Sequence, residues 1–190
     1  MASSRSPRRA HHRPRTTTPA ERGSAVVFAE PSSTADPGPG VGPVVVLGEW
    51  WEEMQECLDS RPVKFARNLN FRSGIASSIK AGVAFLDASA TAFAIVLGDQ
   101  PLISSSVTNK VIEAYAEDLY GIVIPVYNHR RGHPLLVDMK YRKEIEQLNL
   151  EEGLRKLRHH FPEDVLEVEV DAPGILVDID TREDYQKARD

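Results

Sequence analysis

Residues 92–101 read AFAIVLGDQP, and the fold can be worked out from this stretch outward. Its first six residues are apolar without interruption, a pattern typical of a strand that is covered on both faces of a parallel sheet. Gly98 permits close backbone approach after the strand, and Pro101 ends the strand and can begin the next helix. Asp99 therefore stands just beyond the carboxyl end of a buried strand, where ligands bind in open α/β sheets.

Short apolar runs alternate with helical patterns on both sides of this strand. The alternation predicts an α/β, three-layer sandwich around a mainly parallel, Rossmann-like sheet with right-handed crossovers. The polar turn at 128–132 predicts a hairpin or a longer reversal, and Thr181 with Asp184 predicts a capping box for a terminal helix. The predicted strands are 44–47, 63–66, 92–97, 121–127, 134–137, 165–170 and 175–179, and the predicted helices are 49–58, 73–86, Ser104 or Ser105 to Leu119, 141–147 and 151–159.

The composition limits the classes of protein to consider. The chain has 190 residues, of which 41% are hydrophobic and 27% charged, as expected of one soluble globular domain. No apolar run approaches the roughly 20 residues that span a bilayer, so no membrane partner is expected. The single cysteine, Cys57, excludes a disulfide scaffold, and its place in the helical pattern at 49–58 predicts a packed small side chain.

The formal net charge of -5 hides an asymmetry along the chain. Residues 1–23 contain six arginines and one glutamate, whereas the sequence from Val41 onward carries a net charge of -8. An acidic body excludes nucleic acid as the expected partner, because affinity for phosphate backbones comes from Lys and Arg. The sequence thus divides into a basic, Pro- and Gly-rich head at 1–40 and a domain at 41–190.

The head is predicted to be disordered, although a transit peptide or an arm for an anionic partner would share its composition. Three prolines interrupt any amphipathic helix in residues 1–23, and no secretory apolar region follows, so a cytoplasmic location is expected. Residues 31–43 are predicted to be a linker or long loop. Gly38, Gly40 and Gly42 precede an apolar run instead of following a strand, which favours a flexible lead-in over a phosphate-binding loop.

Carboxylates mark the ends of two predicted strands. Asp99 is a candidate Mg²⁺ ligand, with a turn or helix-cap aspartate as the alternative. Asp178 and Asp180 flank Ile179, and strand alternation would turn both carboxylates to one face, where they could bind one ion; alternatively, Asp180 caps the terminal helix. Between these sites, residues 130–134 (RRGHP) form a cationic turn that suits an anionic substrate, or else a solvated hairpin tip.

Four segments together resemble the molybdenum cofactor cytidylyltransferases, which belong to the MobA-like NTP transferases. They are residues 68–79 (NLNFRSGIASSI), 97–101 (LGDQP), 130–134 (RRGHP) and 174–185 (GILVDIDTREDY). The first is similar to the family pattern N-P-x-W-x-x-G-M-S-S-S-[IL]. The resemblance runs from about Val44 to the C-terminus and implies a sheet of the nucleotide-diphospho-sugar transferase type.

The resemblance also implies a reaction. The terminal phosphate of molybdopterin would attack the α-phosphorus of CTP with the help of Mg²⁺ and release pyrophosphate, with GTP as the substrate in the related guanylyl transfer. Such transfers depend on alignment and charge neutralisation more than on a protein nucleophile. The implied partners are CTP or GTP, molybdopterin, and a molybdoenzyme or its maturation chaperone.

Residue roles follow from the same resemblance. Asp99 would be the metal ligand, with Asp178 or Asp180 as the second. The turn at Ser77 and Ser78 would belong to the nucleotide pocket, and Gly132 with His133 to the molybdopterin side. The implied catalytic residues are Asp99 and His133, and the implied binding residues are Asn68, Gly74, Ser77, Ser78, Gly98, Arg131 and Gly132.

The sequence also departs from the family. Members open with a strand and an L-A-A-G-x-S-x-R-M-G-x-x-K loop that holds the triphosphate. Here residues 25–29 (AVVFA) offer only a surrogate first strand, and Glu30 to Ser33 stand where the glycine loop should be. The fold is therefore expected to be N-terminally incomplete and the transfer impaired. The alternatives are an inactive remnant or binding module of the same family, or a rearranged gene start over residues 1–40.

Overall fold

The computed structural model describes residues 25–29, 43–117, 119–148 and 153–189. The predicted disordered head at 1–23 and nearly all of the predicted linker at 31–43 lie outside the described residues. Within the described part of the chain, no helix has both the length and the apolar character needed to cross a membrane.

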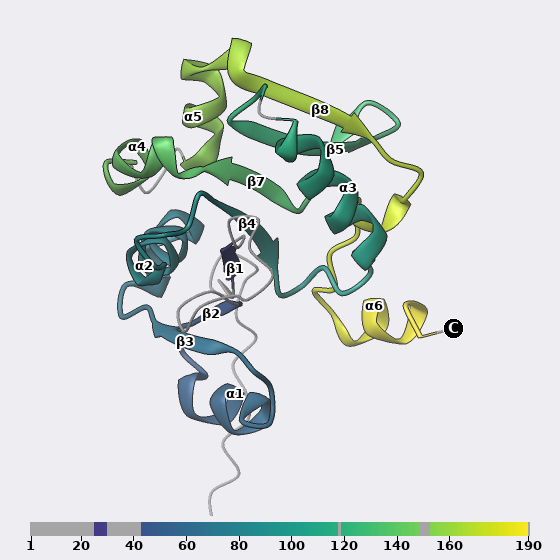
Figure 1. Ribbon diagram of the computed structural model, residues 1–190. Helices are drawn as coiled ribbons and strands as arrows, with labels where there is room; N and C mark the ends of the chain where they lie inside the picture. The colour runs from purple at the N-terminus through teal and green to yellow at the C-terminus, as the bar shows by residue number, and fades with distance from the viewer. Residues whose placement is uncertain (1–24, 30–42, 118, 149–152, 190) are drawn as a thin grey trace, which may run out of the picture.

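A single eight-stranded sheet forms the centre of the described structure (Figure 1). The strand order is β3-β2-β1-β4-β7-β5-β6, and β8 also pairs with β5. The strands are β1 (Ala25–Ala29), β2 (Val44–Leu47), β3 (Lys64–Arg67), β4 (Ala92–Leu97), β5 (Ile122–Tyr127), β6 (Arg130–Arg131), β7 (Leu135–Asp138) and β8 (Val165–Glu169).

The strand directions make the sheet mixed. Five strands point the same way, namely β2, β3, β4, β5 and β8. Strand β2 is parallel to β3, and β5 is parallel to β8. Strand β1 is antiparallel to both β2 and β4, and β7 is antiparallel to both β4 and β5, so all five share one direction. The predicted α/β class is confirmed, and five strands share one direction as expected. Most neighbouring pairs are nevertheless antiparallel, because β1 and β7 lie between strands of the common direction and β6 turns back on β5. We call the end where the five strands finish the carboxyl end of the sheet.

Strand β1 occupies the place between β2 and β4 in the reverse direction. Its first residue, Ala25, is opposite Val46 and Leu97, near the carboxyl end of the sheet. Its last residue, Ala29, is opposite Phe93 at the other end. The surrogate strand suggested by the sequence therefore forms, but the chain leaves it at the end of the sheet that is remote from Asp99.

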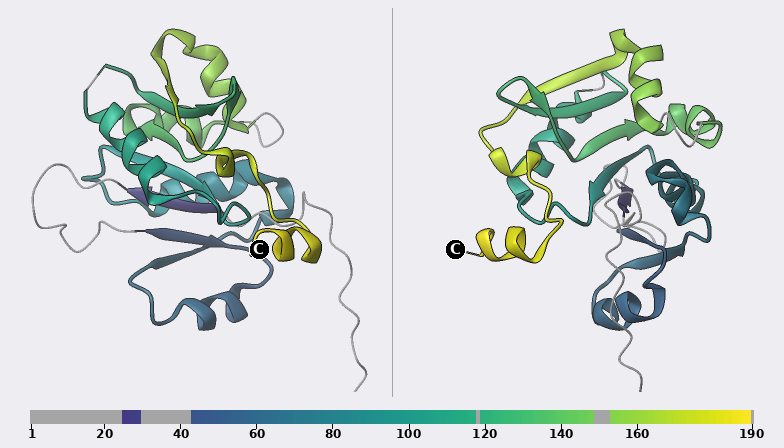
Figure 2. Two further views of the ribbon diagram at one scale, coloured as in Figure 1. Left: turned by 90° about the vertical axis from the view of Figure 1, so that its right-hand side faces the viewer. Right: turned by 180° about the vertical axis from the view of Figure 1, so that it is seen from behind.

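Helices cover both faces of the sheet (Figure 2). On one face, Ile79 and Val83 of α2 pack with Phe93 and Ile95 in the main core. On the other face, Val111 of α3 packs against small side chains of β4. The helices are α1 (Trp51–Leu58), α2 (Ile75–Phe85), α3 (Ser105–Ala116), α4 (Arg142–Glu146), α5 (Gly153–His160) and α6 (Arg182–Lys187). Two predicted caps are present, since Ser104 accepts from the Val107 N–H and Thr181 forms a capping box with Asp184.

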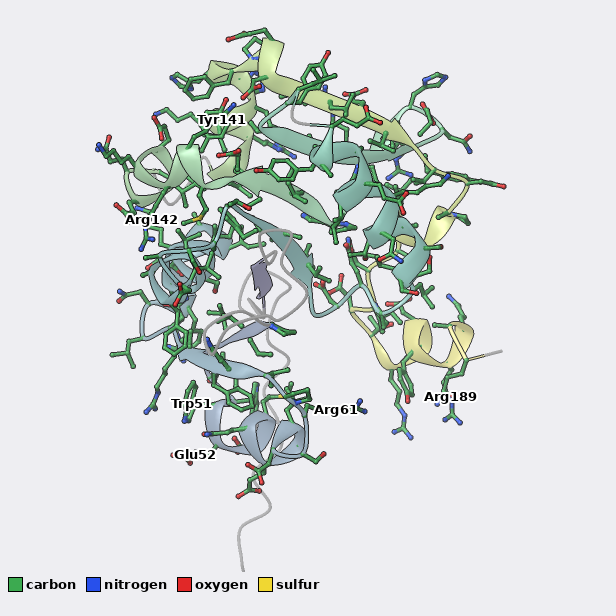
Figure 3. The ribbon with its side chains drawn as sticks, viewed as in Figure 1. Trp51, Glu52, Arg61, Tyr141, Arg142 and Arg189 are labelled. Atoms are coloured by element: carbon green, nitrogen blue, oxygen red, sulfur yellow. The ribbon has the colours of Figure 1, made fainter. Side chains whose placement is uncertain are left out.

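Helix α1 corrects one prediction. None of its side chains is buried, and Cys57 is exposed, so the predicted packed cysteine is wrong. Trp51 (Figure 3) makes an edge-on contact with Phe65 of β3, with ring centroids 6.3 Å apart, and the Arg67 guanidinium lies 5.6 Å from its ring centroid. The side of the helix that carries Cys57 faces solvent because no described element covers it.

The strand predicted at 175–179 is also wrong. Pro173–Leu176 form a 3₁₀ turn, η5, and Asp178 follows in irregular chain. Pro173 starts the turn because its ring fixes φ and removes a ladder donor. Alternation along a strand therefore cannot be what orients Asp178 and Asp180.

Candidate active site

Two motifs that are 78 residues apart meet at the carboxyl end of the sheet. The Ile179 N–H donates to the Asp99 carbonyl oxygen over 2.7 Å, and the Gln100 amide Nε2 donates to Asp178 Oδ1 over 2.7 Å. Consecutive residues on one segment thus bond to consecutive residues on the other. We call this contact the seam. It fixes Asp178 relative to Asp99.

Two glycines hold a third motif and the turn η5 in place. A Cβ on Gly132 would lie 2.5 Å from the carbonyl oxygen of Ile175. A Cβ on Gly174 would lie 2.5 Å from the carbonyl oxygen of Leu102, just beyond the motif that contains Asp99. Since real Cβ atoms do not approach backbone oxygen so closely, only glycine fits at either position. The segments at 97–102, 130–134 and 174–180 are therefore interlocked by backbone contact.

His133 is the titratable group with the most perturbed pKa in this region. Burial lowers the pKa of His133 to about 4, while nearby Asp178 opposes the shift and Arg158 adds to it. The imidazole is consequently neutral at pH 7. A neutral ring can donate one hydrogen bond and accept another, but it supplies no positive charge to an anionic substrate.

The three candidate carboxylates differ in exposure. Asp178 is exposed, and Asp99 and Asp180 are partly buried. The capping box belongs to Thr181, so Asp180 is not the N-cap of α6. No group of three or more His, Cys, Asp or Glu side chains gathers as a metal site in the described ranges.

The donor set still fits a hard divalent cation. Mg²⁺ is usually held by one or two carboxylates together with substrate phosphates and water, so Asp99 and Asp178 across the seam suffice. A neighbouring amide oxygen, Gln100 Oε1, is buried and has no hydrogen-bond partner among the described residues. The fit therefore depends on the carboxylate oxygens, which are the ligands that hard cations prefer.

Of the predicted nucleotide-pocket residues, Asn68 follows β3, which β2 and β1 separate from β4, whereas Gly74, Ser77 and Ser78 belong to α2 and its N-terminus. Asn68 is buried and its Nδ2 donates to Ser77 Oγ over 2.8 Å and to Ser78 Oγ over 3.0 Å. Ser78 is fully buried, so its hydroxyl supports Asn68 from within the core. Gly74 precedes α2 with φ of 92°, a conformation that favours glycine.

An open cavity adjoins these residues. Its volume is about 510 Å³, and two cations, Arg67 and Lys80, border it. The full lining is Arg67, Asn68, Leu69, Asn70, Ser77, Lys80 and Ala81. It begins at the carboxyl end of β3, the same end of the sheet as Asp99. The structure thus brings Asn68, Gly74 and Ser77 together but keeps them two strands away from the seam.

Two further features complete the description of the region. Arg131 forms an ion pair with Glu167 of β8, so part of its charge is compensated there.

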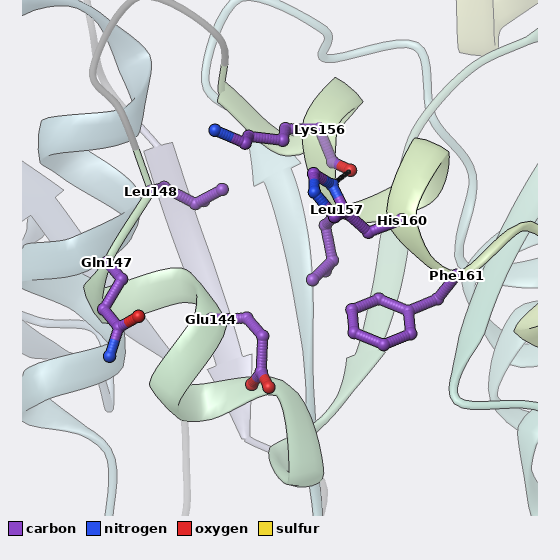
Figure 4. A pocket seen from close by; sticks show the side chains of 7 residues that line it. All are labelled: Glu144, Gln147, Leu148, Lys156, Leu157, His160 and Phe161. Atoms are coloured by element: carbon purple, nitrogen blue, oxygen red, sulfur yellow. Dashed lines mark hydrogen bonds between the residues drawn. The ribbon is translucent and has the colours of Figure 1, made fainter.

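A mostly apolar cavity of about 220 Å³ lies between α4 and α5, where Leu148, Leu157 and Phe161 line it (Figure 4). This cavity contains none of the predicted site residues.

Gln100 is the site residue that the sequence analysis missed. The quoted motif contains it, but nothing in the sequence indicates that its side chain is buried and crosses to Asp178. Its position directly after Asp99 was the available signal.

The segments that carry Asp99 and Asp178 thus meet at the carboxyl end of a sheet with the order β3-β2-β1-β4. The chain belongs to the MobA-like NTP transferase domain family, whose model matches residues 32–165. No curated protein matches the chain.

Three solved structures similar to this chain come from mycobacteria. Rv0371c from Mycobacterium tuberculosis H37Rv is 25% identical with a TM-score of 0.63 over 76% of this chain and 74% of that chain. The same protein in complex with manganese is 25% identical with a TM-score of 0.59 over 76% and 75%. An Rv0371c homolog from Mycobacterium sp. strain JC1 is 22% identical with a TM-score of 0.64 over 90% and 86%, which supports the fold.

Proposed function

We propose that this protein is a nucleotidyltransferase of molybdenum cofactor biosynthesis that transfers CMP from CTP to molybdopterin. The observation that supports the proposal is the seam, in which the Asp178 carboxylate accepts from the Gln100 amide and the Ile179 N–H donates to the Asp99 carbonyl oxygen at the carboxyl end of the sheet. The motifs on both sides of the seam are those that resemble the cytidylyltransferases.

In the proposed reaction, a phosphate oxygen of molybdopterin attacks the α-phosphorus of CTP. The bond from that phosphorus to the bridging oxygen breaks, and pyrophosphate leaves. A divalent cation would neutralise the charge on the phosphates, and the manganese complex of Rv0371c supports such a cation. Asp99, with Asp178 or Asp180, would hold it. Mg²⁺ is the expected ion because it accompanies triphosphates and prefers carboxylate oxygen.

The remaining site residues would bind and orient the acceptor. Gly132, which packs against Ile175, is followed by His133, whose imidazole is partly buried and neutral. A neutral imidazole can hydrogen-bond to the uncharged pterin ring without a charge to desolvate. The pterin side is therefore assigned to Gly132 and His133, and the cavity between Arg67 and Lys80 to the nucleotide.

The direction of β1 supports impaired transfer. In complete family members a glycine-rich loop follows the first strand, whereas here Ala29, the last residue of β1, is at the end of the sheet remote from Asp99. Losing one preorganised charge-stabilising donor costs about 100- to 1000-fold in rate. We therefore expect turnover at least about 1000-fold below that of a complete relative. A binding module of the same family is the second candidate, and the reversed strand is the observation that favours it.

The binding experiment measures CTP and GTP separately by calorimetry with Mg²⁺ or Mn²⁺. Asp99→Asn should abolish metal-dependent binding and leave the melting temperature nearly unchanged. Asp59→Asn removes the same charge at the C-terminus of α1 and should bind as the wild type does. Equal loss of stability and binding in Asp99→Asn would mark Asp99 as a structural residue and contradict the proposal.

Turnover is measured as pyrophosphate release with molybdopterin, CTP and Mg²⁺. Grafting a family-type first strand and glycine-rich loop ahead of Val44, with the intervening segment, should raise the rate by at least about 1000-fold. GTP in place of CTP tests guanylyl transfer. Binding without turnover in the grafted chain would favour the binding module.

A further inference from the structure

Gln100 has its backbone fixed on both sides. Its N–H donates to the Leu97 carbonyl oxygen over 3.2 Å, and its carbonyl oxygen accepts from the Ile103 N–H over 3.4 Å. The residue is only 7% exposed. The side chain therefore starts from a defined place between β4 and α3, with little freedom to move into solvent.

The orientation of the Gln100 amide follows from its partner. An ionised carboxylate only accepts hydrogen bonds, so the nitrogen of the amide, and not its oxygen, faces Asp178 Oδ1 at 2.7 Å. The opposite orientation would bring two acceptor oxygens together. Oε1 must then point away from Asp178, and this is the buried acceptor that has no hydrogen-bond partner in the described part of the chain.

This orientation has a cost, because a buried acceptor without a donor loses its hydration, and the bond to Asp178 offsets part of that cost. Asp178 itself is exposed, and the amide of Gln100 and the neighbouring Ile179 N–H bond its segment to the Asp99 segment. Without Gln100, the Asp178 side chain would be free to turn toward solvent.

We propose that Gln100 is a positioning residue for the divalent cation: its amide nitrogen holds the Asp178 carboxylate next to the segment that carries Asp99, so that Asp178 is available to the ion bound by Asp99. The proposal rests on the metal site of the proposed function. Residues that hold metal-binding carboxylates typically change metal affinity by about 10- to 100-fold when they are replaced.

The main test measures Mn²⁺ affinity by electron paramagnetic resonance, without nucleotide. Gln100→Met keeps the side-chain length and removes both polar atoms, so it should weaken Mn²⁺ binding about tenfold or more. In an Asp178→Ala background the same change should cost about threefold or less, because its main partner is gone. Gln147→Met, at the exposed end of α4, is the matched control and should bind Mn²⁺ as the wild type does.

Equal weakening by Gln100→Met in both backgrounds, or none in either, would overturn the proposal. A second measurement needs no metal: urea unfolding of the two single variants and the double variant of the apo protein should be non-additive. Additive unfolding together with intact Mn²⁺ binding by the wild type overturns the role of Gln100 alone. If the unfolding free energies of the variants are non-additive but the wild-type protein binds no Mn²⁺, the metal site of the proposed function is overturned. The role of Gln100 toward the cation is then overturned with it.

Discussion

Gly132 and Ile175 touch backbone to backbone, since a Cβ on Gly132 would lie 2.5 Å from the Ile175 carbonyl oxygen. This contact joins the turn after β5 to η5, the turn that leads into Asp178. The position of Asp178 therefore depends on the glycine at position 132, 46 residues earlier in the chain, as well as on its bond to Gln100.

Gly132→Ala should push η5 away and loosen the seam. Overpacking of this kind typically costs about 1 to 3 kcal/mol, which we expect in the free energy of unfolding measured with urea. Mn²⁺ affinity should fall in the same variant. Gly153→Asn is the control, because nothing lies within 4 Å of a Cβ there and Asn tolerates its φ of +55°. Unchanged stability of Gly132→Ala would contradict the close contact.

His133 should make stability depend on pH in the acid range. The pKa of His133 is lowered to about 4 in the folded chain, so the unfolded chain binds more protons between that value and about 6.5. Stability is then full above about pH 6.5 and falls by about 3 kcal/mol as the pH decreases to about 4. His133→Asn should flatten this part of the curve of unfolding free energy against pH. The exposed His129→Asn should leave the slope as it is.

Asn68 should be a stability determinant as well as a pocket residue. Its side chain bonds to Ser77 and Ser78, and its Oδ1 accepts from the Asn70 N–H over 2.8 Å. Asn68→Ala removes three hydrogen bonds, two of them to buried hydroxyls, which should cost about 2 to 3 kcal/mol in urea unfolding. Asn109→Ala, on the exposed side of α3, should change stability little. A loss of CTP binding without loss of stability would instead identify Asn68 as a direct ligand of the nucleotide.

Asp164 should anchor the start of β5. It accepts from the Gly121 N–H over 3.0 Å and from the Tyr141 hydroxyl, and it pairs with Lys140 Nζ at 2.7 Å. Burial raises the pKa of Asp164, but the bonds from Lys140, Tyr141 and Gly121 outweigh it and lower the pKa overall. The ionised Asp164 carboxylate therefore stabilises the fold at pH values above its pKa in the unfolded chain. This stabilisation is lost as the pH falls through its lower pKa in the folded chain.

Asp164→Asn places an amide donor toward the Lys140 ammonium and should cost about 2 kcal/mol at neutral pH by urea unfolding. Glu163→Gln is the control, since it removes a neighbouring charge from an exposed side chain. If both variants lost the same unfolding free energy, the change in net charge would explain the effect. The bonds that Asp164 makes would then not be its cause.

Local sequence signals predicted the elements whose neighbours lie within a few residues. The apolar run of β4 has the bounds that the sequence indicated, Ser104 caps α3, and Thr181 with Asp184 caps α6. Each of these depends on periodicity or on a hydrogen bond within one turn. The strand predicted at 175–179 failed because Pro173 and Gly174 favour a turn, whereas the apolar residues after them match a strand equally well.

The sequence by itself determined the central buried strand β4 and where Asp99 and Asp178 stand along the chain. Only the tertiary structure decided the direction of β1, because a short apolar segment satisfies its hydrogen bonds in either direction between two strands. Only the tertiary structure brought Gln100 to Asp178, because a contact across 78 residues depends on how the turns pack and leaves no periodic trace in the sequence. Burial follows from local pattern, whereas the alignment of the site is a property of the assembled backbone.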